Sequence, residues 1–180
     1  MLAAVQVNKG KVRPVLDYKQ VNNYVSCHSG GSAVCDETIR KWRQSGKNLA
    51  LLDLKKAYLQ IHVDKNLWKH QIVSYRGKYF YLTRLGFGLN CAPIIMSRIL
   101  EKVLSLTDVI AAGTDNYIDD ILVCEDLVSA EVVASHLKAY GLQTKPAQRL
   151  DEGVKVLGLQ VCKSLCKELV WKHASVVPEI

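Results

Sequence analysis

Short runs of apolar residues with the alternation typical of β-strands recur along the whole chain. They cover residues 12–16, 49–54, 71–75, 79–83, 117–124 and 154–161. The runs on either side of Arg76-Gly77-Lys78 are close enough together to predict a β-hairpin. The run over 117–124 contains two adjacent acids and predicts a second, tight and acidic hairpin.

Between these runs the apolar positions take the spacing of amphipathic helices. The spacing predicts helices over 36–45, 93–105 and 129–140. Ser129 is a plausible N-cap of the last helix, and Gly141 follows its end. No repeat or low-complexity linker interrupts the chain. Strands interspersed with helices predict an α+β fold, with an antiparallel sheet and helices packed on one of its faces.

The composition is that of an ordinary globular protein, with 180 residues of which 49% are hydrophobic and 23% charged. No 18-residue apolar span or signal peptide is evident, so we expect no membrane association. The six cysteines have no C-x-x-C spacing and are interpreted as reduced, apolar fillers. Together these features predict an intracellular protein, of the cytoplasm or the nucleus.

The net charge of +7 is unevenly distributed along the chain. Residues 1–50 hold eight basic and three acidic residues, whereas the other 130 residues contribute only +2. A field of this sign favours a polyanion such as nucleic acid or a nucleotide phosphate. We therefore expect the N-terminal part of the chain to contribute to binding such a partner.

Two adjacent carboxylates, Asp119 and Asp120, interrupt an apolar strand pattern. A solvated Asp-Asp turn would explain a bare pair. Asp53, however, ends another apolar strand, where an acid has no packing role. Acids on neighbouring strand ends could hold two Mg²⁺ ions roughly 4 Å apart, an arrangement that activates a 3′-hydroxyl and stabilises a pyrophosphate leaving group. The three acids thus predict phosphoryl transfer.

The same residues lie in motifs that resemble those of a known family. Tyr117-Ile118-Asp119-Asp120 matches a Y-x-D-D motif, and the segment 51–61 (LLDLKKAYLQI) matches a motif with an aromatic residue five positions after an acid. Further matches are VRPVLDYKQVN (12–22), LGFGLNCAP (85–93), YGLQTK (140–145) and VLGL (156–159). Their order resembles the palm and part of the fingers of a reverse transcriptase of the long-terminal-repeat retrotransposon and retrovirus type.

This resemblance implies roles for individual residues. Asp53, Asp119 and Asp120 would be the catalytic metal ligands, and the backbone carbonyl of Leu54 would complete the shell of one metal. The implied cofactor is a pair of Mg²⁺ ions, with Mn²⁺ as a substitute. Arg13 would grip the triphosphate of the incoming nucleotide with its planar guanidinium. A solvated surface cation is the alternative reading of Arg13.

Three further residues would surround the incoming nucleotide. Tyr58 matches the aromatic steric gate that lies under the sugar and excludes a 2′-hydroxyl; simple packing is its alternative role. Phe87 and Gly88 match positions beside the base and sugar, where Gly88 would allow close backbone approach. Phe87 stands where retroviral members have a polar residue, which places the chain nearer the gypsy-like retrotransposons.

The chain departs from the family pattern in two respects. The late palm lysine, proposed to donate a proton to pyrophosphate, has no clean match, because neither Lys145 nor Arg149 has the usual spacing. The matched motifs also include none of a thumb or an RNase H domain, so we expect these to be missing from this chain. We expect residues 1–48 to form a partial fingers region and 49–180 the palm, with fingers elements interleaved at about 62–92.

The resemblance therefore predicts an RNA-directed DNA polymerase, a nucleotidyltransferase that adds deoxynucleotides to a primer 3′ end. Its expected partners are an RNA or DNA template with a primer, deoxynucleoside triphosphates, and further polyprotein domains such as a thumb and RNase H. The alternative is a catalytically inactive fragment derived from a retroelement, acting at most as a basic nucleic-acid-binding module.

Overall fold

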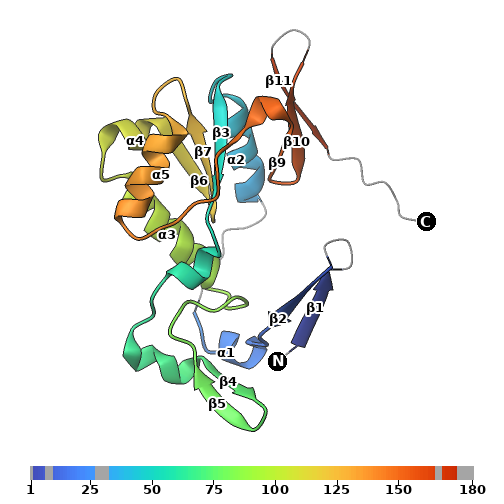
Figure 1. Ribbon diagram of the computed structural model, residues 1–180, viewed down its shortest axis with the longest axis vertical. Coiled ribbons are helices and arrows are strands. Elements are labelled where there is room, and N and C mark those ends of the chain that lie inside the picture. The colour runs from blue at the N-terminus through green and yellow to red at the C-terminus, as the bar shows by residue number, and fades with distance from the viewer. Residues whose placement is uncertain (1, 7–9, 27–32, 165–167, 174–180) are drawn as a thin grey trace, which may run out of the picture. The chain divides into compact units, whose positions relative to one another are not determined.

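The computed structural model describes residues 2–6, 10–26, 33–164 and 168–173. The chain divides into two compact units, each built from two segments (Figure 1). The first unit comprises Met1–Ser29 with Lys56–Met96, and the second comprises Gly30–Lys55 with Ser97–Ile180. The second unit carries the acidic hairpin, and the first carries the hairpin predicted around Arg76.

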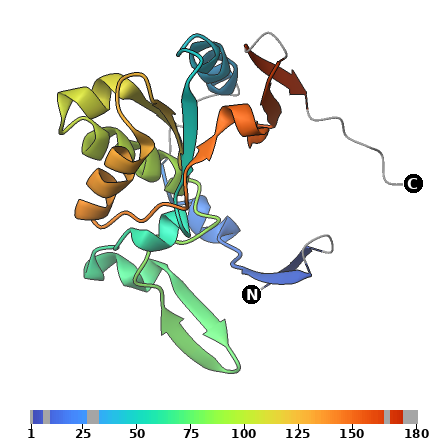
Figure 2. The ribbon, with the colours of Figure 1, turned by 45° about the horizontal axis from the view of Figure 1, so that its top comes forward.

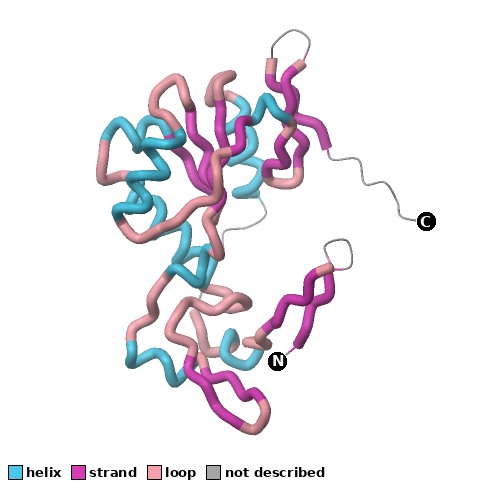
Figure 3. Tube along the Cα trace, viewed as in Figure 1, coloured by secondary structure: helices cyan, strands magenta, loops and turns pink. Residues whose placement is uncertain are grey.

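A four-stranded antiparallel sheet forms the centre of the second unit (Figure 3). Its spatial order is β6-β7-β3-β8. The strands are β6 (Thr114–Tyr117), β7 (Asp120–Cys124), β3 (Leu49–Asp53) and β8 (Gln148–Arg149). The predicted strand over 49–54 and the predicted acidic hairpin are thus both confirmed, and they are hydrogen-bonded neighbours through the pairing of β3 with β7.

Both faces of strand β3 are buried, because its first four residues lie below 5% exposure. Leu49 and Leu51 join a cluster with Trp42 of helix α2 (Ala33–Arg43). Successive strand residues point to opposite faces, so Ala50 and Leu52 face the other way.

Three helices follow in the sequence: α3 (Ala92–Leu104), α4 (Asp108–Gly113) and α5 (Ala130–Ala139). Helix α4 was not predicted. The cap of α5 is as predicted, because the side chain of Ser129 accepts a hydrogen bond from the backbone of Val132. Gly141, just past the helix, has φ +83°, a conformation that glycine adopts without strain.

The predicted single strand over 154–161 is wrong. The chain turns at Leu157 and Gly158, which both have positive φ (47° and 84°). It forms two antiparallel strands, β9 (Val154–Val156) and β10 (Leu159–Lys163). Strand β11 (Leu169–His173) pairs with β10 on its other edge, so this part of the second unit is a three-stranded sheet.

The first unit contains two hairpins. Strands β1 (Leu2–Gln6) and β2 (Lys11–Val15) form one, and β4 (Ile72–Tyr75) and β5 (Lys78–Tyr81) form the other, which is the hairpin predicted from the sequence (Figure 2). Between them lie helix α1 (Lys19–Asn22) and two short 3₁₀ helices over Ala57–Gln60 and Lys65–His70.

A small apolar cluster around Tyr18, Leu85, Leu89 and Ala92 forms the core of this unit. Gly86 packs so closely beneath Tyr18 that an added Cβ would lie 2.8 Å from the tyrosine hydroxyl. Within the described ranges, no helix of either unit is long and apolar enough to cross a membrane.

Candidate active site

The acidic hairpin turns over two residues. Tyr117 pairs with Asp120, which leaves Ile118 and Asp119 as the turn. Ile118 has φ 58°, in a region where two-residue hairpin turns normally carry glycine or asparagine. A β-branched residue there is strained, and such strain persists only where the surrounding structure enforces it. The hairpin therefore holds Asp119 at its tip in a fixed backbone conformation.

The register of β3 against β7 places the third acid beside this turn. Asp53, the last residue of β3, is the Cα partner of Asp120, the first residue of β7. Residues directly opposite each other in an antiparallel pair lie on the same face with neighbouring Cβ atoms. The structure therefore brings together the three carboxylates that the sequence singled out, at one end of the sheet of the second unit.

The electrostatics of this group show how closely the acids interact. Burial, followed by the charges of Asp119 and Asp53, raises the pKa of Asp120 to about 6. Burial also raises the pKa of Asp119, and the charge of Asp53 adds to this rise. Three acids of this kind repel one another unless a cation offsets their charge.

A cation of the protein itself approaches these acids. Thr144 forms an isolated antiparallel β-bridge with Leu54, and the backbone N–H of Lys145 donates a hydrogen bond to the carbonyl oxygen of Asp53 at 2.8 Å. The ammonium group of Lys145 then donates a hydrogen bond to the carboxylate of Asp53. Its charge lowers the pKa of both Asp119 and Asp120, against the effect of burial.

Arg149, the other candidate for the late palm lysine, has different partners. Its guanidinium binds the carboxylates of Glu125, at 3.0 and 3.2 Å, and of Glu131, at 3.4 Å. These two acids raise the pKa of Arg149 further. Of the two basic residues that the sequence left open, Lys145 is therefore the one at the aspartates.

The donor set of this site fits a hard divalent cation. Carboxylate and carbonyl oxygens are the ligands that Mg²⁺ and Mn²⁺ take in proteins. The hydrogen bonds of the Leu54–Thr144 bridge use atoms of Asp53 and Lys55, so they leave the Leu54 carbonyl outside the bridge. Among the described residues, no group of three or more His, Cys, Asp or Glu is arranged to hold a metal ion. The ligand types match a metal, whereas the arrangement with Lys145 on Asp53 is not that of a formed metal site.

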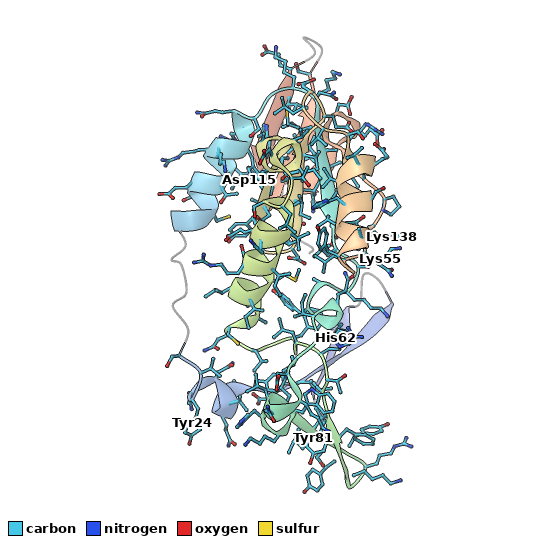
Figure 4. All side chains as sticks on the ribbon, turned by 90° about the vertical axis from the view of Figure 1, so that its left-hand side faces the viewer. Tyr24, Lys55, His62, Tyr81, Asp115 and Lys138 are labelled. Atoms are coloured by element: carbon cyan, nitrogen blue, oxygen red, sulfur yellow. The ribbon has the colours of Figure 1, made fainter. Side chains whose placement is uncertain are left out.

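The hairpin is also anchored by contacts that the sequence did not predict. The carboxylate of Asp115 on β6, a residue labelled in Figure 4, accepts hydrogen bonds from Trp42 Nε1 and from Lys41 Nζ, both at 2.6 Å. Asn116 Nδ2 donates to Ser97 Oγ at 3.2 Å. The sequence marks these contacts only by an acid and an amide just before the Y-x-D-D motif. Their partners could not be predicted, because they lie far away in the sequence.

The predicted sugar-contacting residues meet in the first unit. The rings of Tyr58 and Phe87 lie 5.0 Å apart, centroid to centroid, at an angle of 60°. Tyr58 also packs against the Tyr18 cluster, so its position is fixed by packing on one side. Phe87 is 48% exposed. The pair therefore forms a supported aromatic corner with one solvent-accessible ring.

Gly88 lies next to this corner and needs to be glycine. Its φ is +100°, and an added Cβ would lie 3.2 Å from the carbonyl oxygen of Leu16. Asn22 Nδ2 donates to the Gly88 carbonyl at 2.9 Å. The backbone of Leu16 therefore lies close to Gly88, whereas the approach of Gly88 to a nucleotide stays a prediction. Arg13 lies on β2, paired with Ala4, and its side chain lies outside the described part of the structure.

Comparisons with known proteins agree with these observations. Residues 5–161 match the family model described as reverse transcriptase (RNA-dependent DNA polymerase). A retrovirus-related Pol polyprotein from transposon opus of Drosophila melanogaster is 30% identical over 154 residues, 81% of this chain and 15% of that protein. An uncharacterized protein of Caenorhabditis elegans is 32% identical over 126 residues, 69% of this chain and 8% of that protein.

Solved structures show the same fold. A foamy viral protease-reverse transcriptase in complex with an RNA/DNA hybrid has a TM-score of 0.71 at 19% identity, covering 96% of this chain and 23% of the other. The same kind of protein in complex with double-stranded DNA has a TM-score of 0.67 at 22% identity, covering 92% and 34%. The chain spans less than a sixth of the length of the two curated relatives named above. Because the family model covers most of its residues, the chain belongs to the reverse transcriptase (RNA-dependent DNA polymerase) family.

Proposed function

We propose that this chain carries the nucleotidyl-transfer site of an RNA-directed DNA polymerase, which adds deoxynucleotides to a primer 3′ end along a template. The observation that supports this most is the register of β3 against β7, which sets Asp53 opposite Asp120 beside the strained turn that holds Asp119. Three carboxylates that repel one another lower the stability of the fold. Binding a cation that the reaction needs would offset this repulsion and explains why the acids are present.

Asp53, Asp119, Asp120 and the carbonyl of Leu54 would hold two divalent ions, Mg²⁺ or Mn²⁺ in its place. When bound, such ions activate the attacking 3′-hydroxyl and stabilise charge on the leaving pyrophosphate. Lys145 would leave Asp53 when the ions bind. Its contact with Asp53, where Arg149 instead binds Glu125 and Glu131, supports Lys145 as the late palm lysine that donates a proton to pyrophosphate.

The nucleotide would be bound by residues of the first unit. Arg13 would contact the triphosphate, while Tyr58 would exclude a 2′-hydroxyl, and Phe87 and Gly88 would lie beside the base and sugar. The contact between the rings of Tyr58 and Phe87, with Gly88 directly after Phe87 in the sequence, supports this assignment. Tyr58 is held by packing, so it can oppose an added hydroxyl without moving aside.

We propose that the first compact unit is the partial fingers region and the second is the palm. In this assignment residues 56–96 belong to the fingers, close to the interleaved segment expected at about 62–92, and residues 30–48 belong with the palm. The partners would be an RNA or DNA template with its primer and deoxynucleoside triphosphates. The far greater length of the relatives supports further polyprotein domains, such as a thumb and RNase H.

Primer extension by the 180-residue chain on poly(rA) with an oligo(dT) primer tests this function. We expect Mg²⁺-dependent extension by the wild type. Asp119→Asn keeps the shape but removes a ligand, and should lower the rate by more than the roughly hundredfold typical of losing one electrostatic stabiliser. Asp126→Asn, at an exposed acid of the same unit, is the matched control and should retain activity. Extension near the wild-type rate by Asp119→Asn would contradict the assignment, and no extension by the wild type would favour the inactive binding module.

A further inference from the structure

The β4–β5 hairpin of the first unit exposes an unusual number of aromatic rings. The exposed fractions are 77% for Tyr79, 61% for Tyr81, 49% for Phe80 and 47% for Tyr75. Figure 4 shows Tyr81 at this hairpin. Large apolar rings on a two-stranded ribbon do little for its stability while they remain in water, and contiguous exposed apolar surface marks interaction sites. The hairpin therefore has the kind of surface that binds a partner.

The register of the hairpin sorts these rings onto its two faces. Tyr79 is opposite Ser74 and Tyr81 is opposite Ile72, so the two tyrosines share one face. Because they are two residues apart on one strand, their Cα atoms are separated by about 7 Å. Two rings at this spacing on an open face can each receive one base of an extended single strand.

The charge of the surrounding segment indicates what kind of partner fits. Between Lys65 and Leu100 the sequence contains no acidic residue and six basic ones, which are Lys65, Lys69, Arg76, Lys78, Arg84 and Arg98. The second unit, with fourteen basic and fifteen acidic residues, is close to neutral, so averaging over the chain dilutes this excess. A surface that combines exposed rings with cations, and has no acid nearby in sequence, is complementary to a polyanion whose bases are unpaired.

The turn of the hairpin adds a second sign of function. Arg76 and Gly77 both have positive φ, 50° and 74°, as a two-residue turn of this type requires. Asparagine or glycine fits the first position best, whereas arginine is strained there. Its guanidinium lies over the ring of Tyr75, 5.3 Å from the centroid. The chain thus keeps a cation at the hairpin tip at the expense of local stability.

We propose that the β4–β5 hairpin is a binding site for single-stranded nucleic acid, in which bases stack on Tyr79 and Tyr81 while cations of the surrounding segment, Arg76 at the hairpin tip among them, neutralise phosphates. The inference rests on the proposed function only in taking this strand to be the template. Binding itself needs neither the aspartates nor a metal. Stacking on rings and contacts to phosphates tolerate any sequence, so the site fits a template whose sequence changes at every step.

The test is fluorescence-anisotropy binding of labelled oligo(dT) and oligo(U) to the 180-residue chain, without primer, nucleotide or divalent metal. Threonine retains strand propensity, so Tyr79→Thr and Tyr81→Thr remove the rings and leave the strand. We expect each to weaken binding by roughly tenfold, the effect of losing one stacked base. Tyr24→Thr removes a ring that is 90% exposed elsewhere in the same unit, and should leave the affinity unchanged (Figure 4).

Arg76→Asn is a variant in which we expect no loss of stability, because asparagine suits the turn better than arginine. It should lower the slope of log K against log[salt] by about 0.7, the value for one phosphate contact to a single strand, while the melting temperature stays the same or rises. Asp119→Asn should bind the oligonucleotides as the wild type does. A failure of nucleotide addition is therefore distinguishable from a failure of this site.

Two results would overturn the proposal. One is wild-type affinity and an unchanged salt slope in Tyr79→Thr, Tyr81→Thr and Arg76→Asn. The other is a chain that self-associates through the hairpin, shown in analytical ultracentrifugation by a dimer that Tyr79→Thr dissociates while oligonucleotide binding persists. The second result would make the exposed rings a protein interface.

Discussion

Lys145 donates a hydrogen bond from its ammonium group to the carboxylate of Asp53, 92 positions earlier in the sequence. Both groups are partly exposed, and an ion pair of this kind contributes little to folding. Its importance is electrostatic, because Lys145 lowers the pKa of Asp119 and Asp120 where burial raises it. The lysine is thus the protein's own cation at a site whose acids need one.

Replacing Lys145 should change Mg²⁺ affinity and the rate of nucleotide addition in opposite directions. In Lys145→Met the ammonium no longer competes for Asp53, so Mg²⁺ should bind a few-fold more tightly, in keeping with the ~0.5–1 kcal/mol of an exposed charge pair. Nucleotide addition should nevertheless become slower, by about a hundredfold if a proton donor to pyrophosphate is lost. Calorimetric Mg²⁺ titration and single-turnover extension measure the two effects. The control is Lys138→Met, at an exposed cation of α5, and weaker Mg²⁺ binding by Lys145→Met would contradict competition.

The raised pKa of Asp120 predicts how stability depends on pH when no metal is present. The folded state holds this proton up to about pH 6, whereas an ordinary aspartic acid loses it near 3.8. The folded chain therefore binds more protons than the unfolded chain between these values, so its contribution to stability is full below about pH 4 and is lost as the pH rises through 6.

Asp120→Asn should remove this dependence, and near pH 7 it should unfold at a higher free energy than the metal-free wild type. We expect a gain of about 1 kcal/mol, discounted because the carboxylate is only half-buried. Urea unfolding at several pH values between 4 and 8 measures the difference. If the free energies of unfolding of variant and wild type differed by the same amount at every pH in this range, the pKa of Asp120 would not be raised in the folded state.

The contact of Asp115 with Trp42 should contribute to the stability of the second unit. Trp42 is fully buried, so Asp115→Ala leaves its indole N–H without the partner that accepts at 2.6 Å. An unsatisfied buried donor costs about 1–3 kcal/mol in free energy of unfolding. Denaturant unfolding should show this loss for Asp115→Ala and none for Asp126→Ala. Equal stability of the two variants would rule out an anchoring role for Asp115.

Sugar selection should depend on the ring of Tyr58. Discrimination by a clash is relaxed by a smaller side chain, without any new contact. Tyr58→Val should raise the efficiency of ribonucleotide relative to deoxyribonucleotide incorporation by about tenfold to a hundredfold, equivalent to roughly 1.4 to 2.8 kcal/mol of relieved clash. Single-nucleotide extension with each substrate gives the ratio. An unchanged ratio would mean that Tyr58 only packs against the Tyr18 cluster.

Local patterns in the sequence were sufficient for much of the fold. The apolar run of β3, the glycine turn between β4 and β5, and the cap at Ser129 each depend on neighbouring residues, and each is present as predicted. The turn at Leu157-Gly158, which divides the predicted strand over 154–161 into β9 and β10, was missed because it has no Asn-Gly or Asp-Gly pair.

The site was predictable to the extent that a motif marks it. Asp53, Asp119 and Asp120 stand out because acids interrupt apolar strands. Lys145 could not be chosen over Arg149, because its place depends on a long-range bridge between Leu54 and Thr144. The β4–β5 hairpin was predicted, but its basic and aromatic surface was not recognised, since residues 51–180 taken together contribute a net charge of only +2.

The most direct test of the central claim, that Asp53, Asp119 and Asp120 form one divalent-metal site, is Mn²⁺ binding followed by electron paramagnetic resonance. A titration should show specific binding to the wild-type chain and to Asp126→Asn. The triple variant Asp53→Asn, Asp119→Asn, Asp120→Asn should lose this binding while its circular dichroism stays unchanged. Wild-type Mn²⁺ affinity in the folded triple variant would contradict the account.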